Sequence, residues 1–187
     1  ELWEASGVLA EKLANQGICS GEVVIIFLPN RVEWQVALLG ILRIGGIPAN
    51  LPTRIDADNL RYVAELTGTR AIITTERHRS TPTGEIAHSA AKLCEHRMDV
   101  LLVDENAHNW ITSPEKPIPS ATNVSGLDHI MFTSSTTGRP KAVMHSADSL
   151  AALNQAFTER FSLGAHDAIF MASPLGHSVG TIHGARL

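Results

Sequence analysis

The chain has 187 residues, of which 44% are hydrophobic and 18% are charged, and its formal net charge is -4. These values predict a soluble globular protein with one good-sized core or two small ones. The slight acidic excess, with no Lys/Arg stripe interleaved with aromatic residues, argues against nucleic acid as a partner. No segment reaches the roughly 18 uninterrupted apolar residues of a membrane-spanning helix, and no charged start followed by an apolar stretch marks a signal peptide.

The two cysteines, Cys19 and Cys94, stand in apolar or helical surroundings and lack a CxxC spacing. We therefore expect free, buried thiols in a reducing compartment, and hence a cytoplasmic protein without a disulfide or a cysteine metal site. The chain begins at Glu1 within an apparent helix and ends at Leu187 without a tail. We expect it to be a piece of a longer chain whose C-terminal portion is missing.

Strands and helices are expected to alternate over residues 1–103. Three of the predicted strands are continuously apolar, which is typical of a parallel sheet buried on both faces, and a shorter strand lies among them. The predicted strands are 23–28, 47–50, 71–74 and 100–103. The predicted helices run over 2–14, from a cap at Asn30 with Glu33 to Gly45, from Asp56 or Asp58 to Gly68, and over 85–98. Right-handed crossovers then build a doubly wound, mostly parallel sheet with helices on both faces.

Residues 104–127 are rich in proline and serine and have little apolar periodicity, so we expect a connecting loop. After it, the apolar run 130–132 leads into five hydroxyl residues, and a second apolar run follows at 143–144. This pattern predicts a strand, a polar loop and a strand. The loop consists of Thr133, Ser134, Ser135, Thr136, Thr137, Gly138, Arg139, Pro140 and Lys141.

Such a loop suits an anion, and polyphosphate is the obvious ligand. Hydroxyls and backbone N–H groups donate hydrogen bonds, Gly138 permits positive φ, and Lys141 adds positive charge. It is not a Walker A loop, because Pro140 separates Gly138 from Lys141, no Ser/Thr follows the lysine, and a strand follows instead of a helix. From the residues alone, a Ser/Thr-rich turn between two strands is the alternative.

The nine residues Thr-Ser-Ser-Thr-Thr-Gly-Arg-Pro-Lys, 133–141, closely resemble a signature of the adenylate-forming superfamily. That superfamily comprises acyl- and aryl-CoA synthetases, luciferases and the adenylation domains of peptide synthetases, and the signature is commonly written Thr-Ser-Gly-Thr-Thr-Gly-x-Pro-Lys-Gly. Leu28-Pro-Asn30 and the later Gly-Gly-Ile-Pro-Ala-Asn50 resemble the same superfamily more loosely. The resemblance implies that 1–187 is part of a large N-terminal domain, in which 1–103 hold the alternating units and 128–187 the phosphate loop and acyl pocket.

Three residues depart from the superfamily pattern. Ser135 and Ala142 stand where glycine is usual, and Ala147 stands where many relatives have histidine. A side chain at the first two positions costs little if φ stays negative and more if it must be positive. We therefore keep a non-catalytic member of the superfamily as an alternative.

A helix is expected from Asp148 to Gly164, followed by a strand at 168–172 and then by Ser173-Pro-Leu-Gly-His-Ser-Val-Gly180. His177 comes just after that predicted strand, where open α/β sheets place ligands, although a solvated loop histidine is the alternative. Pro-Leu-x-His-x-x-Gly resembles the superfamily's acyl-pocket motif. The resemblance implies a catalytic and substrate-binding role for His177 between adenylation and thioester formation, and space for the acyl chain at Gly180, which alternatively serves helix packing.

We assign no metal ligand. His183 follows His177 by six residues, which fits no common zinc pattern. His145 either lines the nucleotide cleft or faces a neighbouring strand, and the other histidines are expected on surfaces and loops. These are His78, His88, His96, His108, His129 and His166.

The resemblance implies that the parent enzyme activates a carboxylic acid with ATP and passes the acyl group from an adenylate to coenzyme A. Residues 133–137, Gly138 and Lys141 would hold the β- and γ-phosphates together with magnesium. An adenylation domain that loads a carrier protein is a further alternative. The superfamily's later Tyr-Gly-x-Thr-Glu stretch, ribose-binding Asp and adenylation lysine do not occur before Leu187. We therefore expect the chain alone to be inactive, and neither the acid nor the oligomeric state can be read from it.

Overall fold

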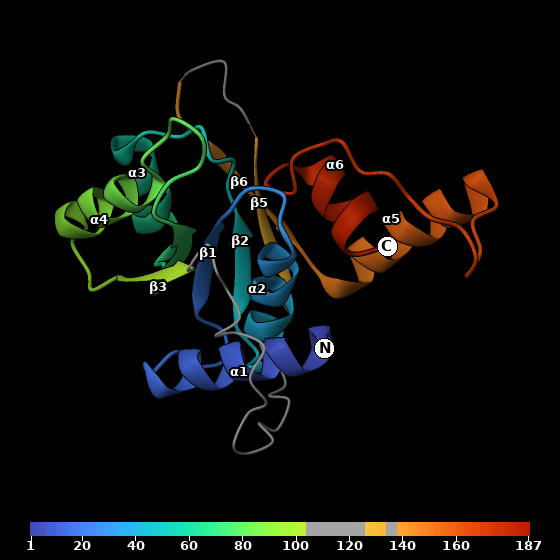
Figure 1. Ribbon diagram of the computed structural model, residues 1–187, viewed down its shortest axis with the longest axis horizontal. Coiled ribbons are helices and arrows are strands. Elements are labelled where there is room, and N and C mark those ends of the chain that lie inside the picture. Colours follow the sequence, from blue (N-terminus) through green and yellow to red (C-terminus); the bar gives the residue numbers. More distant parts are fainter. Residues whose placement is uncertain (104–125, 134–137) are drawn as a thin grey trace.

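A six-stranded sheet forms the centre of the computed structural model, which describes residues 1–103, 126–133 and 138–187 (Figure 1). The predicted connecting loop 104–127 lies almost wholly outside the described residues. The strand order is β4-β3-β1-β2-β5-β6. The strands are β1 Val23–Phe27, β2 Ile47–Asn50, β3 Ala71–Thr75, β4 Asp99–Val103, β5 His129–Thr133 and β6 Lys141–His145.

Five strands run parallel and only β6 is antiparallel to its neighbour. Helices provide the crossovers between the first four strands: α2 Val32–Arg43, α3 Ala57–Thr67 and α4 Thr83–Leu93. All five residues of β1 are buried, as expected for a strand covered on both faces. The predicted doubly wound, mostly parallel sheet is confirmed.

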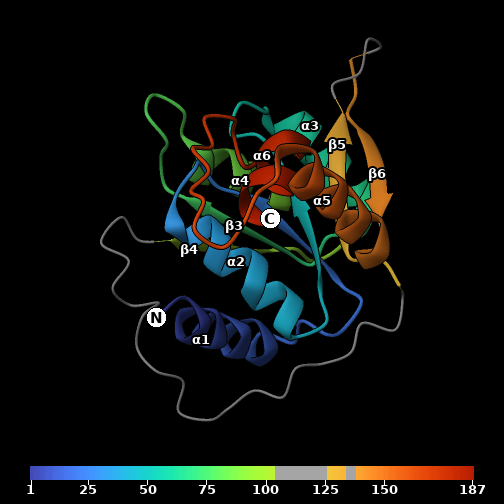
Figure 2. The same ribbon diagram turned by 90° about the vertical axis from the view of Figure 1, so that its right-hand side faces the viewer.

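Each face of the sheet packs against its own helices. On one face α1, Leu2–Asn15, and α2 bring Leu13 and Trp34 against alternate residues of β1. On the other face α3 brings Leu60 and Val63 against the remaining residues, and α4 packs on the same face (Figure 2). Because these four side chains are fully buried, each contributes about 1.5–3 kcal/mol through removal from water.

Some predicted helix boundaries are confirmed and others are wrong. Asp56 caps α3 by accepting a hydrogen bond from the Asn59 N–H at 2.8 Å, and Gly68 ends α3 in the left-handed conformation. Asn30 is not a helix cap, since α2 begins after Arg31 without a side-chain cap. α4 starts and ends earlier than predicted, at 83–93 instead of 85–98.

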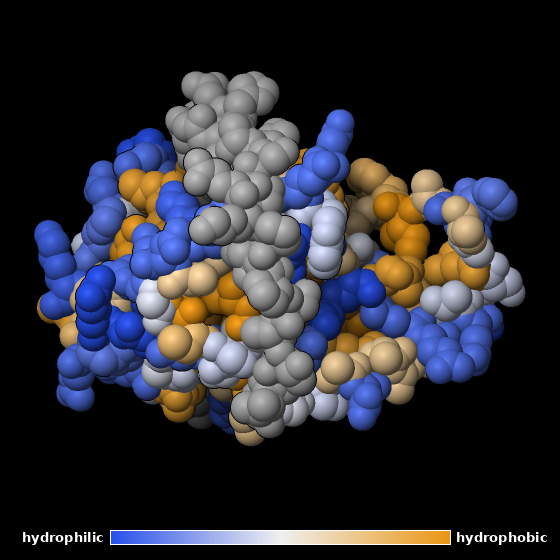
Figure 3. Space-filling view, turned by 90° about the horizontal axis from the view of Figure 1, so that it is seen from below, coloured by the Kyte–Doolittle hydropathy of each residue, from blue (hydrophilic) through white to orange (hydrophobic). Residues whose placement is uncertain are grey.

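The C-terminal region differs more from the prediction. α5, Ala147–Phe161, is capped at its start by Ser146 instead of Asp148, and its C-cap is Ser162, two residues before the predicted end near Gly164. The predicted strand 168–172 has no regular secondary structure. No described strand pairs with it, and Phe170 is 91% exposed. Figure 3 shows apolar surface on the right-hand side, where Figure 1 places α5.

Two smaller expectations concern the thiols and the membrane. Both cysteines are free, as predicted, but Cys19 is exposed and Cys94 is only partly buried, so the predicted burial is wrong. Cys19 lies in the loop between α1 and β1. None of the helices in the described ranges has the length and apolarity needed to cross a membrane.

Candidate functional site

The phosphate-loop signature lies at the end of the β5–β6 pair. Thr133 is directly opposite Lys141 in the antiparallel register, and Phe132 is opposite Ala142. Residues that face each other in this way lie on the same side of the sheet with their Cβ atoms about 4.5–5.5 Å apart. The two predicted strands are therefore confirmed, and Thr133 and Lys141 lie opposite each other at the ends of β5 and β6 that flank the loop. Ser134, Ser135, Thr136 and Thr137 lie outside the described residues.

The described end of the loop contacts helix α3. Gly138 has φ +96°, a conformation that L side chains rarely adopt, and a Cβ at this position would meet no atom of the described residues within 4 Å. Glycine is therefore required there by backbone conformation and not by crowding. The next residue, Arg139, places its guanidinium 4.6 Å from the ring centroid of Tyr62 on α3. Lys141 is exposed and forms no ion pair with any described residue, so its charge is available to an anion.

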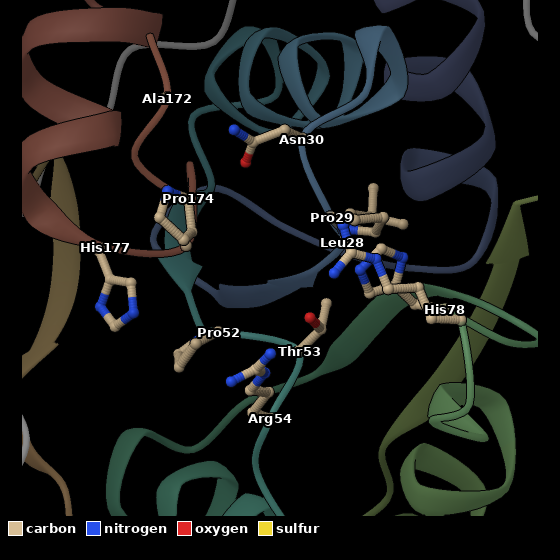
Figure 4. A pocket seen from close by; sticks show the side chains of 12 residues that line it. Leu28, Pro29, Asn30, Pro52, Thr53, Arg54, His78, Ala172, Pro174 and His177 are labelled. Carbon is tan, nitrogen blue, oxygen red and sulfur yellow. The ribbon is translucent and has the colours of Figure 1, made fainter.

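A pocket of about 700 Å³ lies at the carboxyl ends of the parallel strands (Figure 4). The segments after β1, β2 and β3 form most of its wall, and the segment 172–177 closes it. The connections leave β1 and β3 in opposite directions, so the pocket lies at the sheet's topological switch point. Its lining consists of Leu28, Pro29, Asn30, Pro52, Thr53, Arg54, His78, Arg79, Ala172, Pro174, Gly176 and His177.

Positive charge dominates this pocket. Arg54 and Arg79 are exposed at its wall, and the lining includes no carboxylate. Burial, followed by the charges of Arg79, Arg31 and Arg54, lowers the pKa of His78 below its ordinary value. The neutral imidazole of His78 thus adjoins two guanidinium groups, an arrangement that suits an anionic ligand.

His177 lies on a tight turn against the end of β2. Its N–H donates to the Pro174 carbonyl at 3.0 Å, and its own carbonyl accepts from the Thr181 N–H at 2.9 Å. A Cβ on Gly176 would lie 2.6 Å from the Leu51 carbonyl oxygen, so only glycine lets the turn approach the β2 backbone this closely. The His177 side chain is exposed and lines the pocket (Figure 4), although the strand that was expected to precede it at 168–172 does not form.

Gly180 serves packing in the described structure. It ends the short helix α6, Ser178–Gly180, and a Cβ there would lie 2.2 Å from the Pro174 carbonyl oxygen. A side chain would force α6 away from the turn that carries His177. A role for Gly180 in accommodating an acyl chain stays a prediction.

Sequence reasoning missed the role of Asn30. Its Oδ1 accepts from the Leu175 N–H at 2.7 Å, and its Nδ2 donates to the Ser173 carbonyl at 3.0 Å. Asn30 therefore holds the turn before His177 from a position more than 140 residues away. The Leu-Pro-Asn motif was the available signal, although a local pattern could not reveal this partner.

The structure does not bring all predicted site residues into one cavity. Thr133, Gly138 and Lys141 are absent from the lining of the pocket that contains His177. His183 stacks on Phe157 with the ring centroids 4.2 Å apart. His129 was predicted at the surface but is fully buried, because it lies under the C-terminal segment. The described ranges contain no group of three or more His, Cys, Asp or Glu that could hold a metal ion.

Comparison with known proteins identifies the family. A family model described as "AMP-binding enzyme" matches residues 1–185. The chain is 26% identical over 186 residues to the 4-hydroxybenzoate–CoA/benzoate–CoA ligase of Rhodopseudomonas palustris, covering 96% of this chain and 34% of the ligase. It is 28% identical over 185 residues to the dimodular nonribosomal peptide synthase of Bacillus subtilis, covering 97% of this chain and 7% of the synthase.

Solved structures show the same fold. An inhibitor-bound N-terminal domain of FACL13 from Mycobacterium tuberculosis aligns with a TM-score of 0.80 and 22% identity, over 97% of this chain and 45% of that one. An acyl-CoA synthetase from Brucella canis aligns with a TM-score of 0.79 and 22% identity, over 98% of this chain and 34% of that one. The chain thus spans less than half the length of these relatives. It belongs to the AMP-binding family of adenylate-forming enzymes.

Proposed function

We propose that the parent protein of residues 1–187 activates a carboxylic acid with ATP and transfers the acyl group to coenzyme A. A carboxylate oxygen attacks the α-phosphorus, and pyrophosphate leaves. A thiolate sulfur then attacks the acyl carbonyl of the adenylate, and AMP leaves. The observation that carries this proposal is the pairing of Thr133 with Lys141 at the base of a loop with the family's phosphate-binding signature.

The described residues fit a polyphosphate. The Thr133 hydroxyl and the Lys141 ammonium group start on the same face of β5 and β6, and the left-handed Gly138 lets the backbone approach a ligand closely. In our proposal Ser134, Ser135, Thr136 and Thr137 add further hydroxyls and N–H groups. The described side chains supply no metal cluster, so magnesium would arrive bound to the phosphates and neutralise part of their charge.

The pocket beside His177 supports coenzyme A as the acceptor. Its volume of about 700 Å³ is ordinary for a small-molecule site. Arg54 and Arg79 offer guanidinium forks that bind phosphate oxygens in pairs, and coenzyme A carries several phosphates. His177 shares this pocket, which would place it beside the arriving thiol and the acyl group. We include a cytoplasmic location in the proposal, in keeping with two free cysteines.

Loading of a carrier protein is the second candidate, and the similarity to the dimodular peptide synthase favours it. A carrier's phosphopantetheine arm has a single phosphate, so it uses less of the positive charge around Arg54 and Arg79. A non-catalytic member of the family is the third candidate. It is considered because Ser135 and Ala142 stand where the family usually has glycine.

ATP–pyrophosphate exchange by the parent protein tests the first step. A panel of aryl, alicyclic and fatty acids should reveal one class that supports exchange, and Lys141→Ala should abolish most of it. Magnesium-ATP binding without exchange for any acid would instead establish the non-catalytic reading. We expect residues 1–187 alone to show no turnover, and turnover near the parent's rate would contradict that.

A second assay identifies the acceptor. With the preferred acid, thioester formation is measured with free coenzyme A and with a phosphopantetheine-bearing carrier protein. An Arg54→Gln and Arg79→Gln double variant should raise the KM for coenzyme A while leaving pyrophosphate exchange unchanged. Thioester formation on the carrier alone would overturn the coenzyme A assignment and retain adenylation.

A further inference from the structure

A buried polar cluster joins the C-terminal segment to the sheet. His129, the first residue of β5, is fully buried, and its Nε2 lies 2.7 Å from Asn50 Oδ1 on the neighbouring strand β2. Its Nδ1 lies 3.2 Å from a terminal nitrogen of Arg186. The other terminal nitrogen of Arg186 forms an ion pair with Asp128. None of these four residues belongs to the phosphate loop or lines the His177 pocket.

The partners of His129 fix its protonation and its tautomer. A guanidinium group only donates hydrogen bonds, so Nδ1 must carry a lone pair. Nε2 then carries the proton and donates to Asn50 Oδ1. If the Asn50 amide were reversed, two donors would meet, so only this assignment gives both contacts a donor and an acceptor. The imidazole is therefore neutral, consistent with burial, Arg186 and His145 lowering the pKa of His129 well below its ordinary value.

Arg186 is attached to the segment that follows His177. Helix α6 continues into the π-helix η2, Thr181–Ala185, and Arg186 follows directly. The Arg186 N–H donates to the Thr181 carbonyl at 3.1 Å, and its carbonyl accepts from Asn154 Nδ2 on α5 at 2.9 Å. The Thr181 hydroxyl in turn donates to the His177 carbonyl. A continuous series of contacts therefore runs from Asn50 on β2 through His129, Arg186 and Thr181 to the turn that carries His177.

We propose that Arg186 is a positioning residue whose guanidinium group, held by neutral His129 and by Asp128, fixes the helical segment that follows His177. This cluster of Asn50, His129, Arg186 and Asp128 is called the Arg186 clamp. The inference rests on the proposed function in one respect, since the reaction that benefits is thioester formation at His177. A proton on Nδ1 would set an imidazolium ion against the guanidinium group and release the clamp.

The groups around His129 give the direction of the pH effect. Arg186 and the cross-strand neighbour His145 both disfavour protonation, and the Asp128 carboxylate is already paired with Arg186. Because the folded-state pKa of His129 lies below the unfolded value of about 6.5, the clamp contributes fully above that value. Its contribution is lost as the pH falls from there toward the lowered pKa.

The first test observes the ring nitrogens of His129 by ¹⁵N NMR in the parent protein. Neutral Nε2–H with an unprotonated Nδ1 at pH 7 is expected, and Arg186→Met should change the Nδ1 shift. A protonated Nδ1 at pH 7 would overturn the clamp. This measurement needs no activity, so it separates failure of the clamp from failure of the proposed reaction, which absent pyrophosphate exchange would show.

The second test uses turnover. Arg186→Met should lower kcat for thioester formation about 10- to 100-fold through displacement of His177, with the KM for ATP unchanged. Arg160→Met, at an exposed arginine of α5, is the matched control and should have no effect. His129→Gln keeps one donor and one acceptor but cannot titrate. It should therefore retain activity at pH 7, and the loss of thioester-forming activity that the wild type shows below about pH 6.5 should disappear. The proposal would be overturned if the pH–rate profile of His129→Gln fell at low pH as the wild-type profile does. Equal rates for Arg186→Met and Arg160→Met would overturn it as well.

Discussion

Residues 1–103 and residues 126–187 are stabilised by different kinds of interaction. In residues 1–103 the strands and helices bury continuous apolar surface, and α2 alone buries six of its twelve residues. In residues 126–187 the longest helix, α5, has fifteen residues and buries only Leu150. There a small apolar cluster of Met131, Leu150 and Ile182 is supplemented by polar, long-range attachments through Asn30 and the Arg186 clamp. The first region therefore supplies stability, and the second places groups for chemistry.

A matched pair of phenylalanine substitutions tests this contrast most strongly. Phe27→Ala removes a fully buried ring from β1 and should lower the free energy of unfolding by about 3–5 kcal/mol, because a cavity is left in the core. Phe161→Ala removes a ring that is 62% exposed and touches Phe157, so its cost should stay below about 1 kcal/mol. Urea unfolding of both variants measures the difference in the free energy of unfolding. Similar unfolding midpoints would contradict the conclusion that the first region supplies most of the stability.

A substitution at the phosphate loop, in the second region, is expected to affect activity and not stability. Lys141 is exposed and unpaired among the described residues, so Lys141→Ala should leave the unfolding midpoint unchanged. Loss of its charge from the developing pyrophosphate should slow ATP–pyrophosphate exchange about 100- to 1,000-fold. Lys141→Arg is the matched control, which keeps the charge and should retain part of the rate. Equal rates for alanine and arginine would mean that the charge of Lys141 does not act on the phosphates.

The same contrast explains how far the sequence could predict the structure. The strands of the first region were predictable because unbroken apolar runs such as 71–74 have one favourable environment, a sheet covered on both faces. The Asp56 cap was predictable because its partner, Asn59, is three residues away. By contrast, the apolar run 168–172 predicts a strand, yet a strand forms only where another strand supplies hydrogen-bond partners.

The candidate site divides in the same way. Thr133 and Lys141 follow from a contiguous motif, and the turn at His177 follows from its Pro and Gly residues. The roles of Asn30 and His129 depend on partners 145 and 57 residues away, so no local pattern contains them. Asn30 resembles a helix cap, and His129 is a single histidine in a strand. Only the folded topology shows that both residues hold the C-terminal segment.

Asn30 gives a way to detach part of the second region without disturbing the first. Asn30→Ala removes both hydrogen bonds to the turn before His177, which should destabilise that turn by about 1–2 kcal/mol. Asn30→Asp keeps the acceptor for the Leu175 N–H and loses only the donor to Ser173, so a smaller effect is expected. Hydrogen exchange of residues 173–177 measures both variants. A fall in global stability of the same size would show that the turn and the core unfold together.

Arg139 and Tyr62 form a further contact between the two regions. The Arg139 guanidinium lies 4.6 Å from the ring centroid of Tyr62, at the described end of the phosphate loop. Since exposed cation–π contacts are weak, Tyr62→Leu should reduce magnesium-ATP affinity in the parent protein only about two- to fivefold. Tyr62→Phe keeps the aromatic face and should bind as the wild type does. If Tyr62→Leu and Tyr62→Phe bound magnesium-ATP with the same affinity, the contact with α3 would have no part in placing the phosphate loop. The loop would then be positioned by β5 and β6 alone.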